Sequence, residues 1–159
     1  MTVSRRPSLK FGTQTTSGSP SPVAGESVIE AEAYDARMDL GALGDWLERY
    51  FAAWESNDPD DVAALFAPDA VYSYGPFRDE ARGRDEIVRR WVEGGVLPGL
   101  RWSYEALAVE GARGVANWRV SFDSEEGRTE LDGILVLGFD ERGRCTSHRE
   151  WYDRRVVPA

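Results

Sequence analysis

The part of the chain after residue 100 constrains the fold most, because it predicts four long β-strands one after another. Apolar residues alternate or cluster near residues 100–110, 114–123, 128–139 and 145–154, and β-branched and aromatic residues are frequent there. Short polar turns with a glycine separate these segments. Long consecutive hairpins of this kind indicate a curved antiparallel sheet, one face of which the rest of the chain must cover.

The residues before this sheet predict three helices and one strand. Side chains at every fourth position form a wide apolar helix face over residues 41–55: Leu43, Leu47 and Phe51, and beside them Trp46, Tyr50 and Trp54. Asp58 and Pro59 fit the first positions of a second, short helix. A strand follows at 70–74, and a third helix opens at Asp85 and ends at the glycine pair 94–95. The predicted fold class is therefore α+β, with three N-terminal helices on the concave face of the sheet.

The charge of the chain limits its partners. The formal net charge is −9, and residues 1–38 hold four acidic and four basic residues, so the whole excess of acid lies in the remainder. Such a surface repels phosphate groups, which argues against nucleic acid and against anionic membranes as partners. No run of about 18 apolar residues occurs, so no membrane-spanning helix is expected.

The composition changes near residue 38. Residues 1–37 predict a disordered arm, because the segment 15–22 consists of Thr, Ser, Gly and Pro and cannot bury apolar surface, whereas 38–159 predict one folded domain. A docking or targeting peptide is the alternative interpretation of the arm, with anchors at Arg5, Arg6, Leu9 and Phe11. The arginine pair resembles a twin-arginine export signal, but the apolar segment that must follow is missing, so a cytoplasmic location is expected.

Cofactor and metal sites are not expected. Cys145 is the only cysteine and His148 the only histidine, which leaves no internal disulfide and argues against a zinc site of nitrogen and sulfur ligands. No glycine-rich phosphate loop follows a predicted strand, so no nucleotide site is predicted either. We expect Cys145 to have a structural role.

Four segments together resemble the nuclear transport factor 2-like superfamily, in particular its SnoaL-like members. The similarity extends over roughly residues 40–154, and the segments that carry it are Trp46–Trp54, Ala64–Tyr72, Arg82–Ile87 and Arg144–Asp153. The resemblance implies a cone-shaped half-barrel with a central pocket for a small molecule. It implies no single activity, because this fold hosts isomerases, dehydratases, epoxide hydrolases, cyclases and non-catalytic binding proteins.

The catalytic residues of related enzymes can be matched one by one with positions of this chain. Where ketosteroid isomerase-like members have a Tyr and two Asp, this chain has Tyr50, Tyr74 and Leu135. Limonene epoxide hydrolase-like members have Arg-x-Asp on one strand, which matches Arg119 and Ser121 here, and an Asp on the last strand, which matches Glu150. The Tyr and the Asn on their first strand match Tyr72 and Tyr74. SnoaL-like cyclases place an acidic base on the last strand in a His-x-Asp setting, which His148-x-Glu150 resembles best.

The strand at 114–123 allows two orientations. Asn117, Arg119 and Ser121 share one of its faces, and the resemblance implies that this face lines the cavity, where Arg119 would pair with Glu150. The other face carries Trp118, Val120 and Phe122, which hydrophobic patterning alone would bury. If Arg119 faces the cavity, these residues and Trp151 lie on the outer face of the sheet, and a homodimer is expected to cover them. Asp132 should alternate away from the cavity.

Three functions stay open on this basis. The first is a cofactor-independent enzyme of proton-transfer type (cyclase, isomerase or dehydratase) that acts on a small hydrophobic carbonyl compound. The others are a non-catalytic small-molecule-binding protein and an interaction module that docks another protein through its sheet. The predicted catalytic residues are Glu150, Arg119, His148 and Tyr74, and the predicted substrate-binding residues are Tyr50, Tyr72, Trp54, Trp91, Asn117, Ser121, Leu135 and Tyr152.

Overall fold

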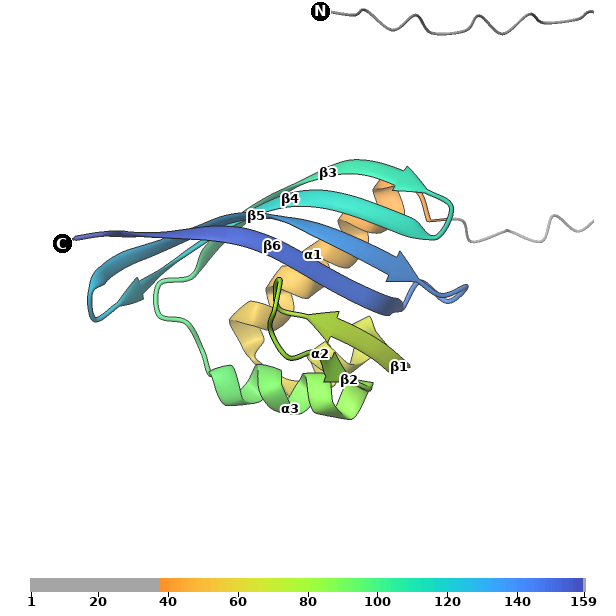
Figure 1. Ribbon diagram of the computed structural model, residues 1–159, viewed down its shortest axis with the longest axis horizontal. Helices are drawn as coiled ribbons and strands as arrows, with labels where there is room; N and C mark the ends of the chain where they lie inside the picture. Colours follow the sequence, from red (N-terminus) through yellow and green to blue (C-terminus); the bar gives the residue numbers. More distant parts are fainter. Residues whose placement is uncertain (1–37, 159) are drawn as a thin grey trace, which may run out of the picture. The chain divides into compact units, whose positions relative to one another are not determined.

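The computed structural model describes residues 38–158, so the arm predicted at 1–37 lies outside the described residues. In chain order, the elements are α1 (Leu40–Ser56), α2 (Pro59–Leu65), β1 (Phe66–Ser73), β2 (Ala81–Arg82), α3 (Arg84–Gly94), β3 (Arg101–Glu110), β4 (Arg113–Ser124), β5 (Gly127–Phe139) and β6 (Cys145–Val157). The three helices lie on one side of a strongly curved sheet, with α1 in its concave face (Figure 1). The predicted α+β class is confirmed.

One sheet contains the six strands of residues 38–158, in the order β2-β1-β6-β5-β4-β3. The four long strands β3 to β6 form consecutive antiparallel hairpins, as the sequence predicts. β1 pairs with β6 in parallel and with the short β2 in antiparallel orientation, so the sheet is mixed rather than purely antiparallel. The parallel pair places Tyr72 opposite His148, so side chains far apart in the sequence meet at the centre of the fold.

Local capping explains where the helices begin and end. The Asp39 carboxylate accepts a hydrogen bond of 2.8 Å from the Ala42 amide at the start of α1, and Asn57 ends the helix in a left-handed conformation (φ 50°). Asp58 caps α2, with Pro59 in its first turn. The apolar face of α1 predicted from the sequence is buried, and its fully enclosed residues are Leu43, Trp46, Leu47, Tyr50 and Phe51.

The orientation of β4 differs from the prediction that followed from the family resemblance. Trp118 and Val120 lie on the inner face, each with 2% of its surface exposed, and Arg119 points outwards. Burial of the indole and the valine removes apolar area from water at about 25 cal/mol per Å², whereas burial of the guanidinium would require it to lose its hydration. Hydrophobic patterning therefore determines which face of β4 lies inside.

Glycines allow two close approaches that shape the interior. A Cβ atom on Gly114 would lie 2.8 Å from Leu43 Cδ1, so this glycine lets β4 lie directly on α1. A Cβ atom on Gly133 would collide with the backbone oxygen of Trp151 and with the Tyr152 side chain. The absence of a side chain at these positions permits the close packing of β4 on α1 and of β5 on β6.

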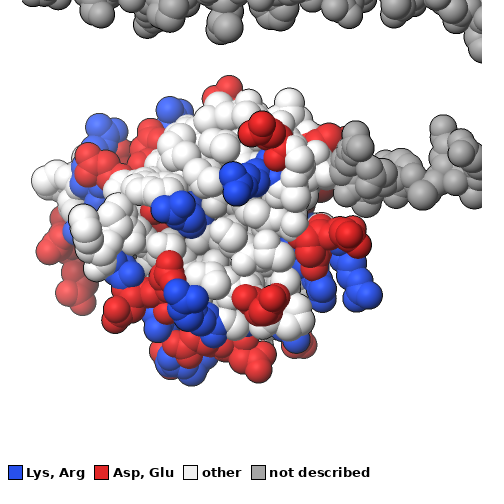
Figure 2. All heavy atoms as spheres, turned by 45° about the vertical axis from the view of Figure 1, so that its right-hand side comes forward, with Lys and Arg blue, Asp and Glu red and all other residues white. Residues whose placement is uncertain are grey.

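The distribution of surface charge and the length of the helices bear on nucleic acid and membranes as partners. On the face shown in Figure 2, acidic and basic side chains are interspersed around an uncharged area, and no continuous basic patch is visible. Within residues 38–158, no helix is long and apolar enough to cross a membrane.

Candidate functional site

Three side chains from three elements form a buried hydrogen-bonded chain. The hydroxyl oxygens of Tyr50 on α1 and Tyr72 on β1 are 2.8 Å apart, and Tyr72 donates to Glu150 Oε2 on β6 across 3.2 Å. Tyr72 has only one proton to give, so when it donates to the carboxylate, Tyr50 must be the donor to the Tyr72 oxygen. Glu150 is only 6% exposed, so this is a carboxyl group in the interior of the fold.

A cavity of about 240 Å³ opens beside this chain. Aromatic rings make up most of its wall, and the polar groups of Glu150, Arg90 and Asn57 also border it; the lining is Trp54, Asn57, Tyr72, Tyr74, Arg90, Trp91, Gly94, Gly95, Leu97 and Glu150. An apolar cavity with a few polar groups is typical of a small-molecule site. Glu150 and four of the aromatic residues singled out in the sequence thus line this cavity, and their roles in a site stay a prediction.

Tyr74 adds a hydrogen-bond donor to the same cavity. Its ring stacks on that of Tyr72, with 4.3 Å between the centroids. Its hydroxyl is buried and has no hydrogen-bond partner among residues 38–158. A buried phenol without a partner is costly in a protein interior, so a ligand oxygen or a water in the cavity would satisfy it. Glu150 and Tyr74 thus line the same cavity, one with a carboxyl group and the other with a buried hydroxyl that has no partner among residues 38–158.

The pKa values separate the roles of these groups. Burial raises the pKa of Glu150 to about 7, although the hydrogen bond from Tyr72 and the charge of Arg78 act in the opposite direction. Burial and the nearby Glu150 charge raise the pKa values of Tyr50 and Tyr72 well above 10.0, and burial raises the pKa of Tyr74 to about 12. At neutral pH the tyrosines therefore remain hydrogen-bond donors, and Glu150 is the group that can take up or release a proton.

His148 lies deeper, among aromatic rings. Its imidazole stacks on Tyr72 at 3.9 Å with 13° between the planes, and it lies 5.3 Å from the Tyr50 ring. Neither ring nitrogen has a partner among residues 38–158, and burial lowers the pKa of His148 to about 3. His148 is therefore a neutral ring that holds Tyr72 in place, and it makes no hydrogen bond to Glu150. Leu135 is buried on β5 opposite Glu150 and provides an apolar neighbour.

The predicted pair of Arg119 and Glu150 does not form, and that prediction is wrong. Arg119 Nε lies 2.8 Å from Asp132 Oδ2, and the two side chains are 66% and 55% exposed. Asn117 also donates to Asp132, and Ser121 accepts a hydrogen bond from Arg128. All three predicted site residues of β4 thus lie outside the pocket, because Trp118 and Val120 occupy the inner face. Asp132 alternates away from the cavity, as expected.

The structure also places one arginine in the cavity lining and a second, Arg78, on the loop beside β6, and the sequence singled out neither. Arg90 borders the cavity and is held by Glu86, with 2.7 Å between Nε and Oε1. Arg78 donates to the Tyr152 hydroxyl across 3.2 Å, and neither residue belongs to the cavity lining, so the predicted residue Tyr152 lies beside the site. The only sequence signal for Arg78 is its place after Gly75-Pro76 at the end of a predicted strand, where loop side chains often carry function.

Comparisons with known proteins point to one family. The family model of the SnoaL-like domain matches residues 47–148. A steroid Δ-isomerase from Nocardioides simplex is 35% identical over 116 residues, which cover 70% of this chain and 92% of the relative.

Two solved structures share the fold at low sequence identity. One is an LEH-like epoxide hydrolase of M. tuberculosis (TM-score 0.60, 19% identity, 71% of this chain and 84% of the other). The other is SalBIII, an epoxide hydrolase/cyclase-like enzyme in pyran ring formation in the polyether salinomycin (TM-score 0.63, 15% identity, 75% and 98%). At these identities the two structures support the fold alone.

Proposed function

The chain belongs to the SnoaL-like domain family, and from that premise we propose that it is a cofactor-independent enzyme that moves a proton on a hydrophobic carbonyl compound. The observation that carries this proposal is that Glu150 and Tyr74 line one aromatic cavity and that the buried Tyr74 hydroxyl has no hydrogen-bond partner among residues 38–158. Its relative named a steroid Δ-isomerase favours isomerisation among the reactions of the family.

Glu150 acts as the base in this mechanism. Its carboxylate removes a proton from a carbon next to the carbonyl group, and the electron pair of that C–H bond moves into the developing enolate. A pKa of about 7 suits both halves of a reaction at neutral pH, since the group accepts the proton and can then return it to another carbon. Return at a different carbon moves a double bond, and no other reactant is consumed.

The tyrosines stabilise the charges that appear during the reaction. Tyr74 donates a hydrogen bond to the oxygen on which the enolate charge collects, in a cavity where water competes little. Tyr72 holds the charged form of Glu150, and Tyr50 supports Tyr72. Trp54 and Trp91 provide flat apolar walls that bind and orient the carbon skeleton.

Glu150→Gln tests the proposal directly. Conversion of β,γ-unsaturated ketones, steroidal and non-steroidal, to their conjugated isomers is followed by ultraviolet absorbance. We expect the substitution to lower kcat by about 10²–10⁴-fold, the usual contribution of a general base. Glu126→Gln, at the exposed turn between β4 and β5, is the matched control and should behave as the unsubstituted protein. Equal turnover by Glu150→Gln would refute the base assignment, and a ligand that binds but is recovered unchanged would favour a binding protein.

A homodimer that uses the outer face of the sheet is part of the proposal. The predicted interface residues Trp118, Val120 and Phe122 face the core, so the apolar patch that supports a dimer consists of the half-buried Val115, Ile134 and Val136 and the exposed Trp151. Trp151 is 37% exposed, and the Arg149 guanidinium lies 4.9 Å from its ring centroid. Sedimentation velocity of the protein and of Trp151→Glu measures the mass in solution. If the unsubstituted protein sediments as a monomer, the proposed homodimer is contradicted.

Location in the cytoplasm is likewise a proposal. It is supported by the single, buried Cys145, which can form no internal disulfide. Fractionation of the source cells, with detection of the chain by antibody, is the appropriate measurement, and recovery outside the cytoplasmic fraction would contradict it.

A further inference from the structure

We propose that the pocket selects substrates that carry an anionic group, in particular a carboxylate, and that Arg78 binds this group at the edge of the site. The inference rests on the proposed function for the position of the reacting carbon beside Glu150. It adds to that function the class of compound on which the enzyme acts.

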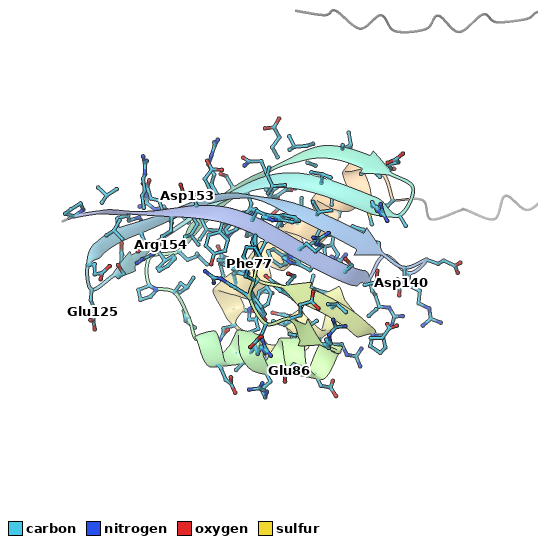
Figure 3. All side chains as sticks on the ribbon, viewed as in Figure 1. Phe77, Glu86, Glu125, Asp140, Asp153 and Arg154 are labelled. Atoms are coloured by element: carbon cyan, nitrogen blue, oxygen red, sulfur yellow. The ribbon has the colours of Figure 1, made fainter. Side chains whose placement is uncertain are left out.

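Arg78 lies next to the strand that carries the proposed base. Its loop joins β1 to β2 and reaches β6, and Figure 3 shows the neighbouring Phe77 on this loop. The guanidinium carbon of Arg78 is 5.8 Å from the Tyr152 ring centroid, and Nη1 donates to the Tyr152 hydroxyl. A Cβ atom on Gly75 would lie within 3.9 Å of both the Arg78 side chain and the Glu150 backbone oxygen, so the loop packs directly beside Glu150.

Arg78 also lacks an anionic partner. Among residues 38–158, no carboxylate lies within ion-pair distance of it, and its hydrogen bond goes to a neutral phenol. Arg90, which lines the cavity, is paired with Glu86, and Arg82 on β2, the strand after the loop, is paired with Glu80. Arg78 is therefore the arginine beside the pocket whose charge remains available to a ligand.

The spacing along β6 defines the shape of the substrate. Glu150 and Tyr152 are alternate residues on the inner side of the strand, so their side chains lie about 7 Å apart. Arg78 is hydrogen-bonded to Tyr152, so its guanidinium lies on the Tyr152 side of the base. A guanidinium fork binds carboxylates in a bidentate manner. The expected substrate has an acidic C–H next to a carbonyl at one end and a carboxylate at the other, joined by a flat apolar skeleton of one or two fused rings.

The aromatic walls and the size of the cavity fit such a skeleton. Trp54, Trp91 and Tyr74 offer flat surfaces, and the volume of about 240 Å³ suits a compact ring system. The negative charge of the domain as a whole would repel an anion at long range, so a local cation is required to bind one. The charge of Arg78 also reaches Glu150, where it favours the ionised base.

Isothermal titration calorimetry with two matched probes tests the inference. The probes are 6-hydroxy-2-naphthoate, whose hydroxyl imitates the enol and whose carboxylate lies at the far end of the rings, and 6-hydroxy-2-naphthamide, which has the same shape without the charge. We expect the protein to bind the carboxylate about tenfold more tightly, as for a charge-assisted hydrogen bond. In Arg78→Gln this preference should disappear, with the amide bound as before.

Two further variants make the result decisive. Arg149→Gln removes an arginine from the outer side of β6 and should keep the preference, whereas Arg78→Lys should keep part of it and shows that charge is what counts. Equal binding of both probes by the unsubstituted protein, or an unchanged preference in Arg78→Gln, overturns the inference. Failure of the proposed function is a separate result. If Glu150→Gln leaves turnover unchanged while the carboxylate preference that depends on Arg78 persists, Glu150 is not the base, but the assignment of Arg78 as the carboxylate-binding residue stands.

Discussion

The two faces of the sheet carry similar chemical groups with opposite behaviour. On the outer face, Asp132 accepts hydrogen bonds from Arg119 and Asn117, and these interactions hold the pKa of its carboxyl below its usual value. On the inner face, the one hydrogen-bond partner of Glu150 among residues 38–158 is a phenol, and burial raises its pKa to about 7. The environment, more than the residue type, decides which carboxyl group can exchange a proton at neutral pH.

The largest expected effect concerns the apolar residues of the inner face. Trp118→Ala should lower the free energy of unfolding by about 3–5 kcal/mol, because it leaves a cavity under α1. Leu107→Ala on β3, where the side chain is 45% exposed, should cost less than about 1 kcal/mol. Urea denaturation followed by circular dichroism measures both values. Similar losses for the two variants would show that β4 does not bury Trp118.

The next effect is a pH dependence of the free energy of unfolding that distinguishes the Glu150 carboxyl from the Asp132 carboxyl. The pKa of Glu150 is raised from 4.5 to about 7 on folding, so the native state favours its protonated form. Its stabilising contribution is complete below about pH 4.5 and is lost as the pH rises through 7. The loss approaches about 3 kcal/mol, at about 1.4 kcal/mol per pKa unit.

Comparison with Glu150→Gln isolates this contribution. The difference in unfolding free energy between the two proteins should change between pH 4.5 and 8, because only the unsubstituted protein titrates at this position. The pKa of Asp132 is lowered, so its contribution to the free energy of unfolding is present at neutral pH and is lost only as the pH falls into the acid range. A difference that stays constant over this range would mean that Glu150 titrates at an ordinary pKa.

The smallest effect is expected on the outer face. Arg119→Ala removes an exposed ion pair, and exposed pairs contribute little because water and salt screen them. Turnover and probe binding should remain unchanged, since the side chain points away from the cavity. Thermal unfolding and the ketone assay check this expectation, and a loss of activity would restore Arg119 as a site residue.

Much of this arrangement could be predicted from the sequence. The apolar rows at 41–55 and the glycine-containing turns between strands predicted α1 and β3 to β6 to within a few residues. The orientation of β4 could not be decided by alternation alone, because both of its faces form regular patterns. The resemblance to epoxide hydrolase-like members favoured Arg119 inside, whereas the cost of exposing Trp118 and Val120 determined the outcome.

The contacts within the site were harder to predict than its members. Tyr50, Tyr72, Tyr74 and Glu150 were each singled out, but nothing in the local sequence indicated that two hydroxyl groups 22 residues apart would share a hydrogen bond. That contact depends on the parallel pairing of β1 with β6, which hairpin turns do not predict. Arg78 was missed for a similar reason, since it reaches Tyr152 only after the loop has folded onto β6.

The parallel pairing of β1 with β6 has a consequence for the order of folding. Tyr72 and Glu150 are separated by 78 residues, and the hairpins of β3, β4 and β5 lie between them in the chain. Contacts between distant residues form slowly, because a long loop must close before they can contribute. On the ribosome, the helices and the first hairpins can assemble while β6 is still in the exit tunnel, so the protein acquires its binding site only after nearly the whole domain has been translated.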